Sequence, residues 1–381
     1  MLKSPPLSLY IHIPWCVQKC PYCDFNSHAL KSDIDEQLYI KHLLADLDSD
    51  IARFNINRPL HSIFIGGGTP SLFSAPAIKL LLDEVKLRFA NNPEIEITLE
   101  ANPGTVEAGK FEGFSNAGVN RLSVGVQSFA SDKLIKLGRI HDSEQATRAA
   151  EIASTCGVKS FNLDLMHGLE NQSIEHALDD LRQAIALKPK HLSWYQLTIE
   201  PNTAFYSKPP ELPQDDTLWE IQEQGFKLLA AAGYQQYEVS AFSQGEEFQS
   251  KHNINYWQNG DYLGIGCGAH GKITCAAENK IYRTVKVKHP KGYMDEERVH
   301  LDHLTEVSEA ERPFEYMMNR LRLFKPFSLT DFEQATGLSS DYISEHLRTA
   351  KNKKLLSENQ GQWQTTLHGR RYLNDLLELF I

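Results

Sequence analysis

Three cysteines lie close together near the start of the chain and could hold a metal centre. They occupy the stretch Cys16-Val-Gln-Lys-Cys20-Pro-Tyr-Cys23, which has the spacing C-x3-C-x2-C. Thiolates are soft ligands that suit iron–sulfur clusters or zinc. Three thiolates on one loop could bind three irons of a [4Fe–4S] cluster and leave the fourth iron open. A structural zinc site normally needs a fourth protein ligand, which His12 or His28 could supply.

A second group of residues could bind a polar organic ligand. Three consecutive glycines precede Thr69 and Pro70, and consecutive glycines allow unusual backbone angles and the close approach of a ligand. Further polar side chains occur at or beyond the ends of later apolar runs. Each of them alone would fit an ordinary surface or structural role, and together they could meet one ligand. The residues of this group are Gly66, Gly67, Gly68, Thr69, Glu100, Gln127, Arg139 and Asp164.

A third candidate motif is His252-Asn253-Ile254-Asn255-Tyr256-Trp257. A histidine can ligate heme iron, and Tyr and Trp offer flat apolar faces to a porphyrin. The same residues could instead form an aromatic loop that packs on the core. Cys267, between two glycines, is a rival heme ligand, although burial is the more common role of such a residue. Burial is also the role that we expect for Cys156 and Cys275.

An alternation of strands and helices over the first two thirds of the chain would position these residues. It predicts right-handed βαβ units and a parallel sheet, in which ligands bind beyond the carboxyl ends of the strands. Six such units are fewer than the eight of a closed barrel, so we expect an open six-stranded one. The predicted strands are Leu7–Ile13, Ser62–Ile65, Glu96–Glu100, Arg121–Val126, Ser160–Leu165 and His191–Thr198. The predicted helices are Asp35–Arg53, Ala75–Phe89, Glu107–Ala117, Ser143–Thr155 and Ile174–Ala186.

The pattern becomes looser after about residue 240 and then helical near the end. We expect residues 1–240 to form the partial barrel, 241–308 a connector that carries the His252 motif, and 309–381 a small, mainly helical domain. The helices, hairpin and last helix predicted there resemble a winged-helix arrangement. They cover Pro313–Leu323, Leu329–Thr336, Asp341–Lys351, Glu358–Thr366 and Leu367–Leu379.

The net charge of −10 argues against general nucleic-acid binding, which usually shows a basic footprint. Six cysteines in a long chain do not form a disulfide framework, and no apolar run has the length of a membrane span, so we expect a cytoplasmic protein. The last domain has local positive charge, which fits the solvated face of a packing module. Its basic residues are Arg348, Lys351, Lys353, Lys354, Arg370 and Arg371.

The cysteine motif, which follows a predicted strand, resembles that of radical S-adenosylmethionine (SAM) enzymes. More narrowly, Tyr10-Ile-His-Ile-Pro-Trp-Cys16 resembles the oxygen-independent coproporphyrinogen III oxidase family. The resemblance implies an α/β fold with an open partial (β/α)6 TIM-like barrel and a small C-terminal domain. It also implies a [4Fe–4S] cluster on Cys16, Cys20 and Cys23, with SAM bound at the open iron. One or two SAM molecules would then lie among Tyr10, Gly66, Gly67, Gly68, Thr69, Glu100, Gln127, Arg139 and Asp164.

The chain departs from the oxidases at two places. Phe25 stands where the oxidases typically have a further cysteine, and only nine residues precede Tyr10. Both departures, and the H-N-x-x-Y-W pattern at His252, resemble a shorter sister group of heme chaperones. That resemblance implies heme binding by His252, Asn253, Tyr256 and Trp257.

A heme chaperone would deliver heme to respiratory or other membrane heme proteins and would lack coproporphyrinogen oxidase activity. The resemblance further suggests a bacterioferritin-like heme donor, a homodimer and peripheral contact with the membrane during transfer. The alternative is a radical SAM oxidase that decarboxylates the propionates of coproporphyrinogen III. A weaker alternative is a zinc-containing winged-helix regulator.

Overall fold

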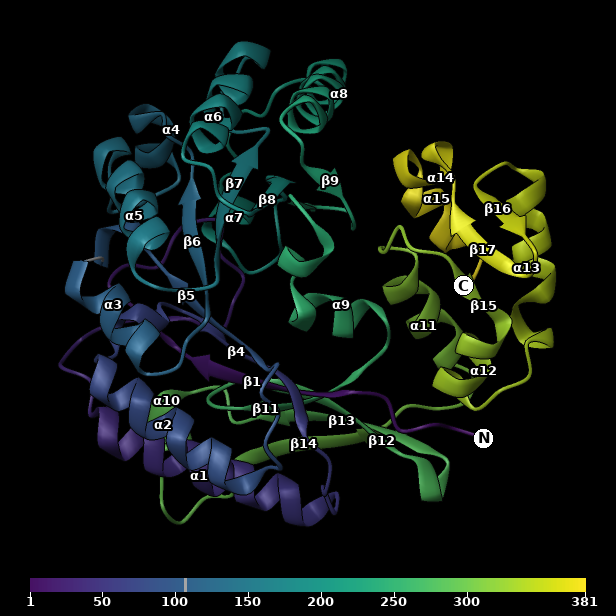
Figure 1. Ribbon diagram of the computed structural model, residues 1–381, viewed down its shortest axis with the longest axis horizontal. Helices are drawn as coiled ribbons and strands as arrows, with labels where there is room; N and C mark the ends of the chain where they lie inside the picture. The colour runs from purple at the N-terminus through teal and green to yellow at the C-terminus, as the bar shows by residue number, and fades with distance from the viewer. Residues whose placement is uncertain (106–107) are drawn as a thin grey trace.

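Six parallel strands form the centre of the structure, a computed structural model that describes residues 1–105 and 108–381 (Figure 1). Their order in the sheet is β1-β4-β5-β6-β7-β8, so each strand lies beside the next one along this part of the chain. Both faces of β1 are buried, as is typical of parallel strands that helices cover. The open α/β barrel that we predicted is therefore confirmed. The bounds are Leu7–Ile13, Leu60–Gly67, Glu96–Ala101, Arg121–Gln127, Ser160–His167 and His191–Gln196.

Helices connect these strands and lie on the outer side of the sheet (Figure 1). The capping residues that begin two of them explain their position: Asp35 accepts a hydrogen bond from the backbone of Leu38, and Asp142 forms a capping box with Gln145. The predicted start of one helix at Glu107 lies outside the described residues. The helices are α1 Glu36–Arg53, α2 Ala75–Arg88, α3 Ala108–Asn116, α4 Ser131–Lys136, α5 Ser143–Thr155, α6 Ile174–Ala186, α7 Ala204–Ser207 and α8 Asp215–Ala231.

The sheet continues beyond the six strands on both sides, to twelve strands in all. On one side, β11 pairs in parallel with β1, and β12, β13 and β14 follow as antiparallel strands. On the other side, β10 and β9 pair antiparallel beyond β8. The bounds are β9 Gln235–Gln236, β10 Ala241–Ser243, β11 Asp261–Ile265, β12 His270–Cys275, β13 Lys280–Lys286 and β14 Leu301–Glu306. Helices α9 Lys251–Trp257 and α10 Pro290–Tyr293 lie among them in the sequence.

Residues 241–308, for which we predicted a connector, therefore contribute strands to the main sheet. We predicted no strands in this segment because its many charged residues suggested exposure to solvent. Some of its lysines are instead buried in ion pairs. Lys286 on β13 is fully buried and pairs with Asp46 and Asp50 of α1. Lys272 on β12 is buried beside Asp261 of β11 in the same way. The domain boundaries that we drew stay predictions.

The C-terminal part has a small hydrophobic core of its own, built around Tyr316, Phe332 and Leu347. The predicted hairpin is present as β16 and β17, which pair antiparallel, and β15 joins them. The last predicted helix is interrupted at Tyr372, whose ψ of 47° is not helical. The elements are α11 Arg312–Arg320, β15 Phe327–Ser328, α12 Leu329–Thr336, α13 Asp341–Asn352, β16 Leu356–Asn359, β17 Gln362–Thr365, α14 Leu367–Arg371 and α15 Leu373–Glu378.

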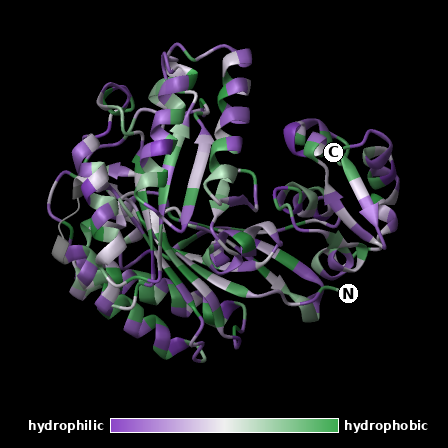
Figure 2. Cartoon of the chain, turned by 45° about the horizontal axis from the view of Figure 1, so that its top comes forward, coloured by the Kyte–Doolittle hydropathy of each residue, from purple (hydrophilic) through white to green (hydrophobic). Residues whose placement is uncertain are grey.

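Arg371 of the C-terminal domain contacts the barrel, where it pairs with Glu223 on α8. Arg370 packs within the domain, with its guanidinium 3.9 Å from the centre of the Phe324 ring. Hydrophobic and hydrophilic residues alternate along the elements of this domain in the cartoon, whereas many of the central strands are coloured as hydrophobic (Figure 2). Among the described residues, we find no helix whose length and apolar character would let it cross a membrane.

Candidate functional site

The three cysteines lie on a loop that begins at the carboxyl end of β1. Two short parallel strands, β2 (Trp15–Cys16) and β3 (His28–Ala29), pair with each other at the two ends of this loop. A backbone hydrogen bond from Cys23 to the Cys20 carbonyl, 3.2 Å long, bends the loop between its last two cysteines. The Cys23 sulfur lies 3.8 Å from the Ser27 hydroxyl. The three cysteines thus lie on one short loop at the end of the first strand.

All three cysteines line one cavity of about 330 Å³. Most of the residues for which the sequence predicted SAM contact line the same cavity, although they come from separate strands and loops. These are Gly67, Gly68, Thr69, Glu100, Gln127, Arg139 and Asp164. Gly66 is directly beside them, and Tyr10 faces a different and larger cavity. The convergence follows from parallel strands whose carboxyl ends meet on one side of the sheet.

The glycines after β4 are required by close contacts with the first strand. The φ angle of Gly67 is +110°, and a Cβ atom there would lie 2.4 Å from the His12 ring. A Cβ atom on Gly68 would lie 2.5 Å from the Trp15 carbonyl oxygen. The Gly68 amide donates to the Ile13 carbonyl at 2.7 Å. The glycine run therefore brings the cysteine loop and the end of β4 into direct contact.

Glu100 and Asp164 place two carboxyl groups in the smaller cavity. Desolvation, together with the nearby charge of Asp164, raises the pKa of Glu100 to about 7, although its carboxylate accepts a hydrogen bond from the Gly67 amide. Desolvation also raises the pKa of Asp164, which accepts hydrogen bonds from Ser123 and Asn162. Two facing carboxyl groups of this kind would be stabilised as anions by a positively charged ligand.

Arg139 links the smaller cavity to the cysteine loop. Its guanidinium donates to the Gly125 carbonyl at 2.6 Å, and one nitrogen lies 3.7 Å from the Cys20 sulfur. Its Nε atom is buried and has no partner among the described residues. Gln127, whose side chain also comes close to Gly125, has a positive φ of 69°, which is uncommon outside glycine, and accepts a hydrogen bond from Tyr195. The strained backbone turns the Gln127 side chain toward the cavity.

The donor set fits a [4Fe–4S] cluster. Burial raises the pKa of the Cys16 and Cys23 thiols, so a cationic centre is needed to hold them as thiolates at neutral pH. Within residues 1–105 and 108–381, no group of three or more His, Cys, Asp or Glu side chains is arranged to hold a metal ion, so the fit to a cluster rests on the number and kind of these donors. The remaining wall fits SAM, because its carboxyl groups suit a cationic ligand and its backbone amides and Arg139 suit polar groups.

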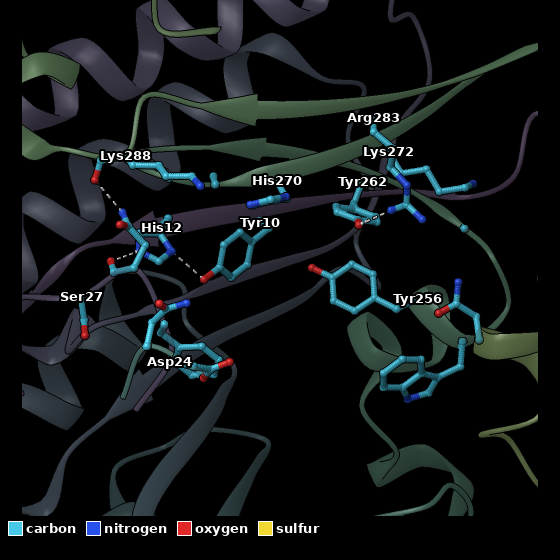
Figure 3. A pocket seen from close by; sticks show the side chains of 18 of the residues that line it. Tyr10, His12, Asp24, Ser27, Tyr256, Tyr262, His270, Lys272, Arg283 and Lys288 are labelled. Carbon is cyan, nitrogen blue, oxygen red and sulfur yellow. Dashed lines mark hydrogen bonds between the residues drawn. The ribbon is translucent and has the colours of Figure 1, made fainter. Parts of the chain in front are cut away.

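A second, larger cavity has a volume of about 790 Å³, and Figure 3 shows residues that line it. Phe25 and Ser27 line both cavities. The volume is within the range of about 300–1,000 Å³ that is common for ligand sites. The walls carry aromatic rings and cationic side chains, and the C-terminal domain contributes Met318 and Asn319 from α11. The aromatic and cationic members are Tyr10, Phe25, Tyr256, Trp257, Tyr262, Lys19, Lys272, Arg283 and Lys288.

The His252 motif forms α9, and its members face different environments. Tyr256 and Trp257 line the larger cavity, whereas His252 and Asn253 do not. His252 is buried, with Nδ1 2.9 Å from the Ser62 hydroxyl and Nε2 2.8 Å from the Tyr256 hydroxyl. Burial lowers the pKa of His252 to about 3. As both ring nitrogens have partners, His252 supports Tyr256 from behind, and Asn253 lies at the first turn of the helix.

The remaining cysteines are buried or half-buried. Cys267, the rival heme ligand, is fully buried and its thiol donates to the Lys288 carbonyl at 3.0 Å. It does not line the larger cavity, although its neighbours Gly268 and Ala269 do. Cys156 is buried at the end of α5, as predicted, and Cys275 is half-buried at the end of β12.

Sequence reasoning missed several residues of the larger cavity. They come from β11, β12, β13 and the residues that follow β13, in the segment that looked like a connector, and are Tyr262, His270, Arg283 and Lys288. A signal was present in the alternation of polar and apolar residues in Lys280–Lys286, since this is the pattern of a half-buried strand. Tyr195, in the smaller cavity, lies on a strand that was predicted but carries no motif of its own.

Comparison with known families places the two parts of the chain. The radical SAM superfamily matches residues 10–183, and the HemN C-terminal domain matches residues 307–372. The chain is similar over its whole length to the heme chaperone HemW of Haemophilus influenzae, with 58% identity and coverage of 100% of this chain and 99% of the relative. The heme chaperone HemW of Escherichia coli is 57% identical, with full coverage of both chains.

Among solved structures, the coproporphyrinogen III oxidase HemN from Escherichia coli, described as a radical SAM enzyme, has the same fold. The TM-score is 0.82, with 99% of this chain and 90% of that chain covered. The sequence identity of 23% is low, so this likeness concerns the fold alone. It confirms the partial barrel with a C-terminal helical domain that the sequence predicted.

Proposed function

The chain belongs to the family of heme chaperones named HemW, and from this premise we propose that it binds a [4Fe–4S] cluster, SAM and heme and delivers the heme to other proteins. One observation carries the proposal. The loop with the three cysteines forms a wall of two adjacent cavities, of which the smaller suits the cluster and SAM and the larger suits a flat ligand.

In the smaller cavity, Cys16, Cys20 and Cys23 would hold the cluster. When bound, a [4Fe–4S] cluster supplies one-electron chemistry to SAM. The Glu100 and Asp164 carboxyl groups would bind the hydroxyl or cationic groups of SAM, and the backbone of Gly66, Gly67, Gly68 and Thr69 would bind its polar end. Arg139 would orient Cys20 as well as the ligand, because its guanidinium is close to both. Gln127 would add a polar contact beside Arg139. Tyr10, which we predicted to contact SAM, lines the larger cavity, so we propose that it contacts heme there.

In the larger cavity, Tyr256 and Trp257 would pack against the porphyrin, as their place in the wall allows. His252 would act through Tyr256, since the two side chains are within hydrogen-bond distance. The carboxylates of heme would meet the cations on the opposite wall. Asn253 would keep the first turn of α9 in place, where its backbone N–H donates a hydrogen bond to the Ser250 hydroxyl.

We assign a role in ligand binding to each of the three predicted segments. Residues 1–240 would hold the cluster and SAM, 241–308 would supply α9 and the outer wall of the larger cavity, and 309–381 would close that cavity from the side. Met318 in the cavity wall and the Arg322 guanidinium, 4.5 Å from the centre of the Trp257 ring, support the last assignment. A lid-like domain at the cavity suits a protein that releases its cargo.

The partners of the transfer belong to the proposal as well. The recipients would be respiratory and other membrane heme proteins, and a bacterioferritin-like protein would be the donor. A cytoplasmic protein that contacts the membrane peripherally and forms a homodimer could serve both. Co-sedimentation with membrane vesicles that contain a heme-free respiratory enzyme, compared with protein-free vesicles, tests the recipient class.

Titration of heme into anaerobic, cluster-reconstituted protein tests the function itself. Saturable binding near one heme per chain is expected. Absence of saturable binding would contradict the proposal. A parallel assay with coproporphyrinogen III separates the oxidase alternative, whose support is the shared fold. We expect no turnover, because Phe25 stands where the oxidases typically have a cysteine. Metal analysis with zinc in place of iron and sulfide would revive the regulator hypothesis.

A further inference from the structure

We propose that His270, on the wall of the larger cavity, is the axial ligand of the heme iron. The inference deepens the proposed function and rests on it, because it concerns how the same cavity holds its cargo. His270 is the first residue of β12 and lies outside every motif that the sequence singled out. Its exposed side chain faces the cavity between Tyr10 and Tyr262 (Figure 3).

The other two histidines of the cavity wall are engaged in hydrogen bonds. The Nε2 of His12 lies 2.9 Å from the Asn26 carbonyl, and its Nδ1 lies 2.9 Å from the Tyr10 hydroxyl. The Nε2 of His28 lies 3.2 Å from the Lys288 carbonyl. Within residues 1–105 and 108–381, no hydrogen-bond partner is found for either ring nitrogen of His270. It is thus the cavity imidazole with both nitrogens available for a metal.

The surroundings of His270 keep its ring in the form that binds iron. A metal-binding imidazole must be neutral, because the lone pair of one ring nitrogen forms the bond. Partial burial and the nearby charges of Lys288 and Arg283 lower the pKa of His270. The neutral ring therefore needs no proton transfer when it binds the iron, and no oxidant or reductant takes part in this step.

The same cations define how the heme would lie. The Lys288 side chain extends along the wall toward His270, and Lys19 lines the cavity near the cysteine loop (Figure 3). Arg283 already binds Glu315 and Tyr262, and Lys272 is paired with Asp261. Among the described cavity residues, Lys288 and Lys19 are therefore the cations that we assign to the two propionates. Tyr256, Trp257 and Met318 would contact the apolar edge. Heme, with two carboxylates, an apolar edge and a central iron, fits a cavity that has cations, apolar side chains and an imidazole in its wall.

The test is a titration of ferric heme into the full-length, cluster-reconstituted protein under anaerobic conditions, with wild type and His270→Ala side by side. Electron paramagnetic resonance separates the two metal centres, because the oxidised [4Fe–4S] cluster is silent and ferric heme is not. We expect a histidine-ligated heme signal in the wild type and its loss in His270→Ala. Heme affinity should fall at least tenfold, and added imidazole should restore the signal.

The controls distinguish the possible failures. The exposed His303 on β14 lies outside the cavity, so His303→Ala should keep the wild-type signal. An unchanged iron content shows that His270→Ala retains the fold around its cluster. Saturable binding with an unchanged signal in His270→Ala would overturn the inference and leave the proposed function intact. If His28→Ala loses the heme signal and His270→Ala keeps it, the iron ligand is His28. This result would also overturn the inference. Absence of binding by the wild type would overturn the proposed function itself.

Discussion

The Nε2 atom of His252 lies 2.8 Å from the Tyr256 hydroxyl, and this contact places the histidine behind the tyrosine rather than in the cavity. The residues of the motif that the sequence predicts to bind heme therefore lie in two different environments. Its two aromatic members line the larger cavity, and its histidine lies within hydrogen-bond distance of one of them.

The first prediction concerns that support. His252→Ala removes two hydrogen bonds and the contact of its ring with Phe64, so we expect the free energy of unfolding to fall by about 2–4 kcal/mol. Chemical denaturation measures the change. The heme signal of the folded variant should still show histidine ligation. A variant of full stability that loses this signal would instead make His252 the iron ligand.

The second prediction concerns the response to acid. Burial lowers the pKa of His167, on β7, to about 4. Because an unfolded histidine titrates near 6.5, the unfolded chain binds the extra proton first, and the free energy of unfolding falls as the pH drops from 6.5 toward 4. His167→Gln cannot take up this proton. Relative to wild type, it should lose about 2–3 kcal/mol less between pH 7.5 and pH 4.5.

Denaturation curves at several pH values measure this difference. The matched control is the same exchange, His303→Gln, at a side chain that is 70% exposed in the wild type. Equal slopes for wild type and His167→Gln would mean that His167 is not held neutral by burial.

The third prediction concerns SAM. The Glu100 pKa of about 7 leaves this carboxyl group about half protonated at pH 7, and a cationic ligand favours its ionised form. Binding of SAM should therefore release about half a proton per chain at pH 7. Calorimetry in two buffers with different ionisation enthalpies measures the release, and Glu100→Gln should abolish it. Release that persists in the variant would come from another group.

The fourth prediction compares two glycines with positive φ. A Cβ atom at Gly67 would meet the His12 ring at 2.4 Å, whereas one at Gly361, with φ of +79°, would meet no atom within 4 Å. Gly361→Ala should cost about 1 kcal/mol of stability through backbone strain alone. Gly67→Ala should cost clearly more stability and should reduce the iron content after reconstitution. The new methyl group would displace the His12 ring, whose Nε2 contacts the Asn26 carbonyl just after the cysteines. Equal effects would show that the close approach is not needed.

The parts of the fold that follow from local pattern were predictable. The helices Ser143–Thr155 and Ile174–Ala186 have the predicted bounds, because a capping residue precedes each and an apolar stripe runs along it. The smaller cavity was also within reach, since its residues lie at the ends of predicted parallel strands.

The larger cavity was not predictable in the same way. Its outer wall depends on β11 pairing in parallel with β1 over some 250 residues of sequence separation, which no local pattern reveals. The buried Lys272 and Lys286 made β12 and β13 look like exposed segments. The carboxylate partner of Lys272 is on the preceding strand, and those of Lys286 are on α1, far away in the sequence. The position of His270 depends on the pairing of β11 with β1 and on the pairing of β12 with β11.

The most direct test of the central claim is transfer of the cargo. Heme-loaded, cluster-reconstituted protein is mixed anaerobically with membranes that contain a heme-free respiratory heme enzyme, and the heme spectrum and activity of that enzyme are followed. The account predicts that heme appears in the enzyme faster than from an equal amount of free heme, with activity restored. Heme that stays on the protein, or transfer no faster than from free heme, would contradict it.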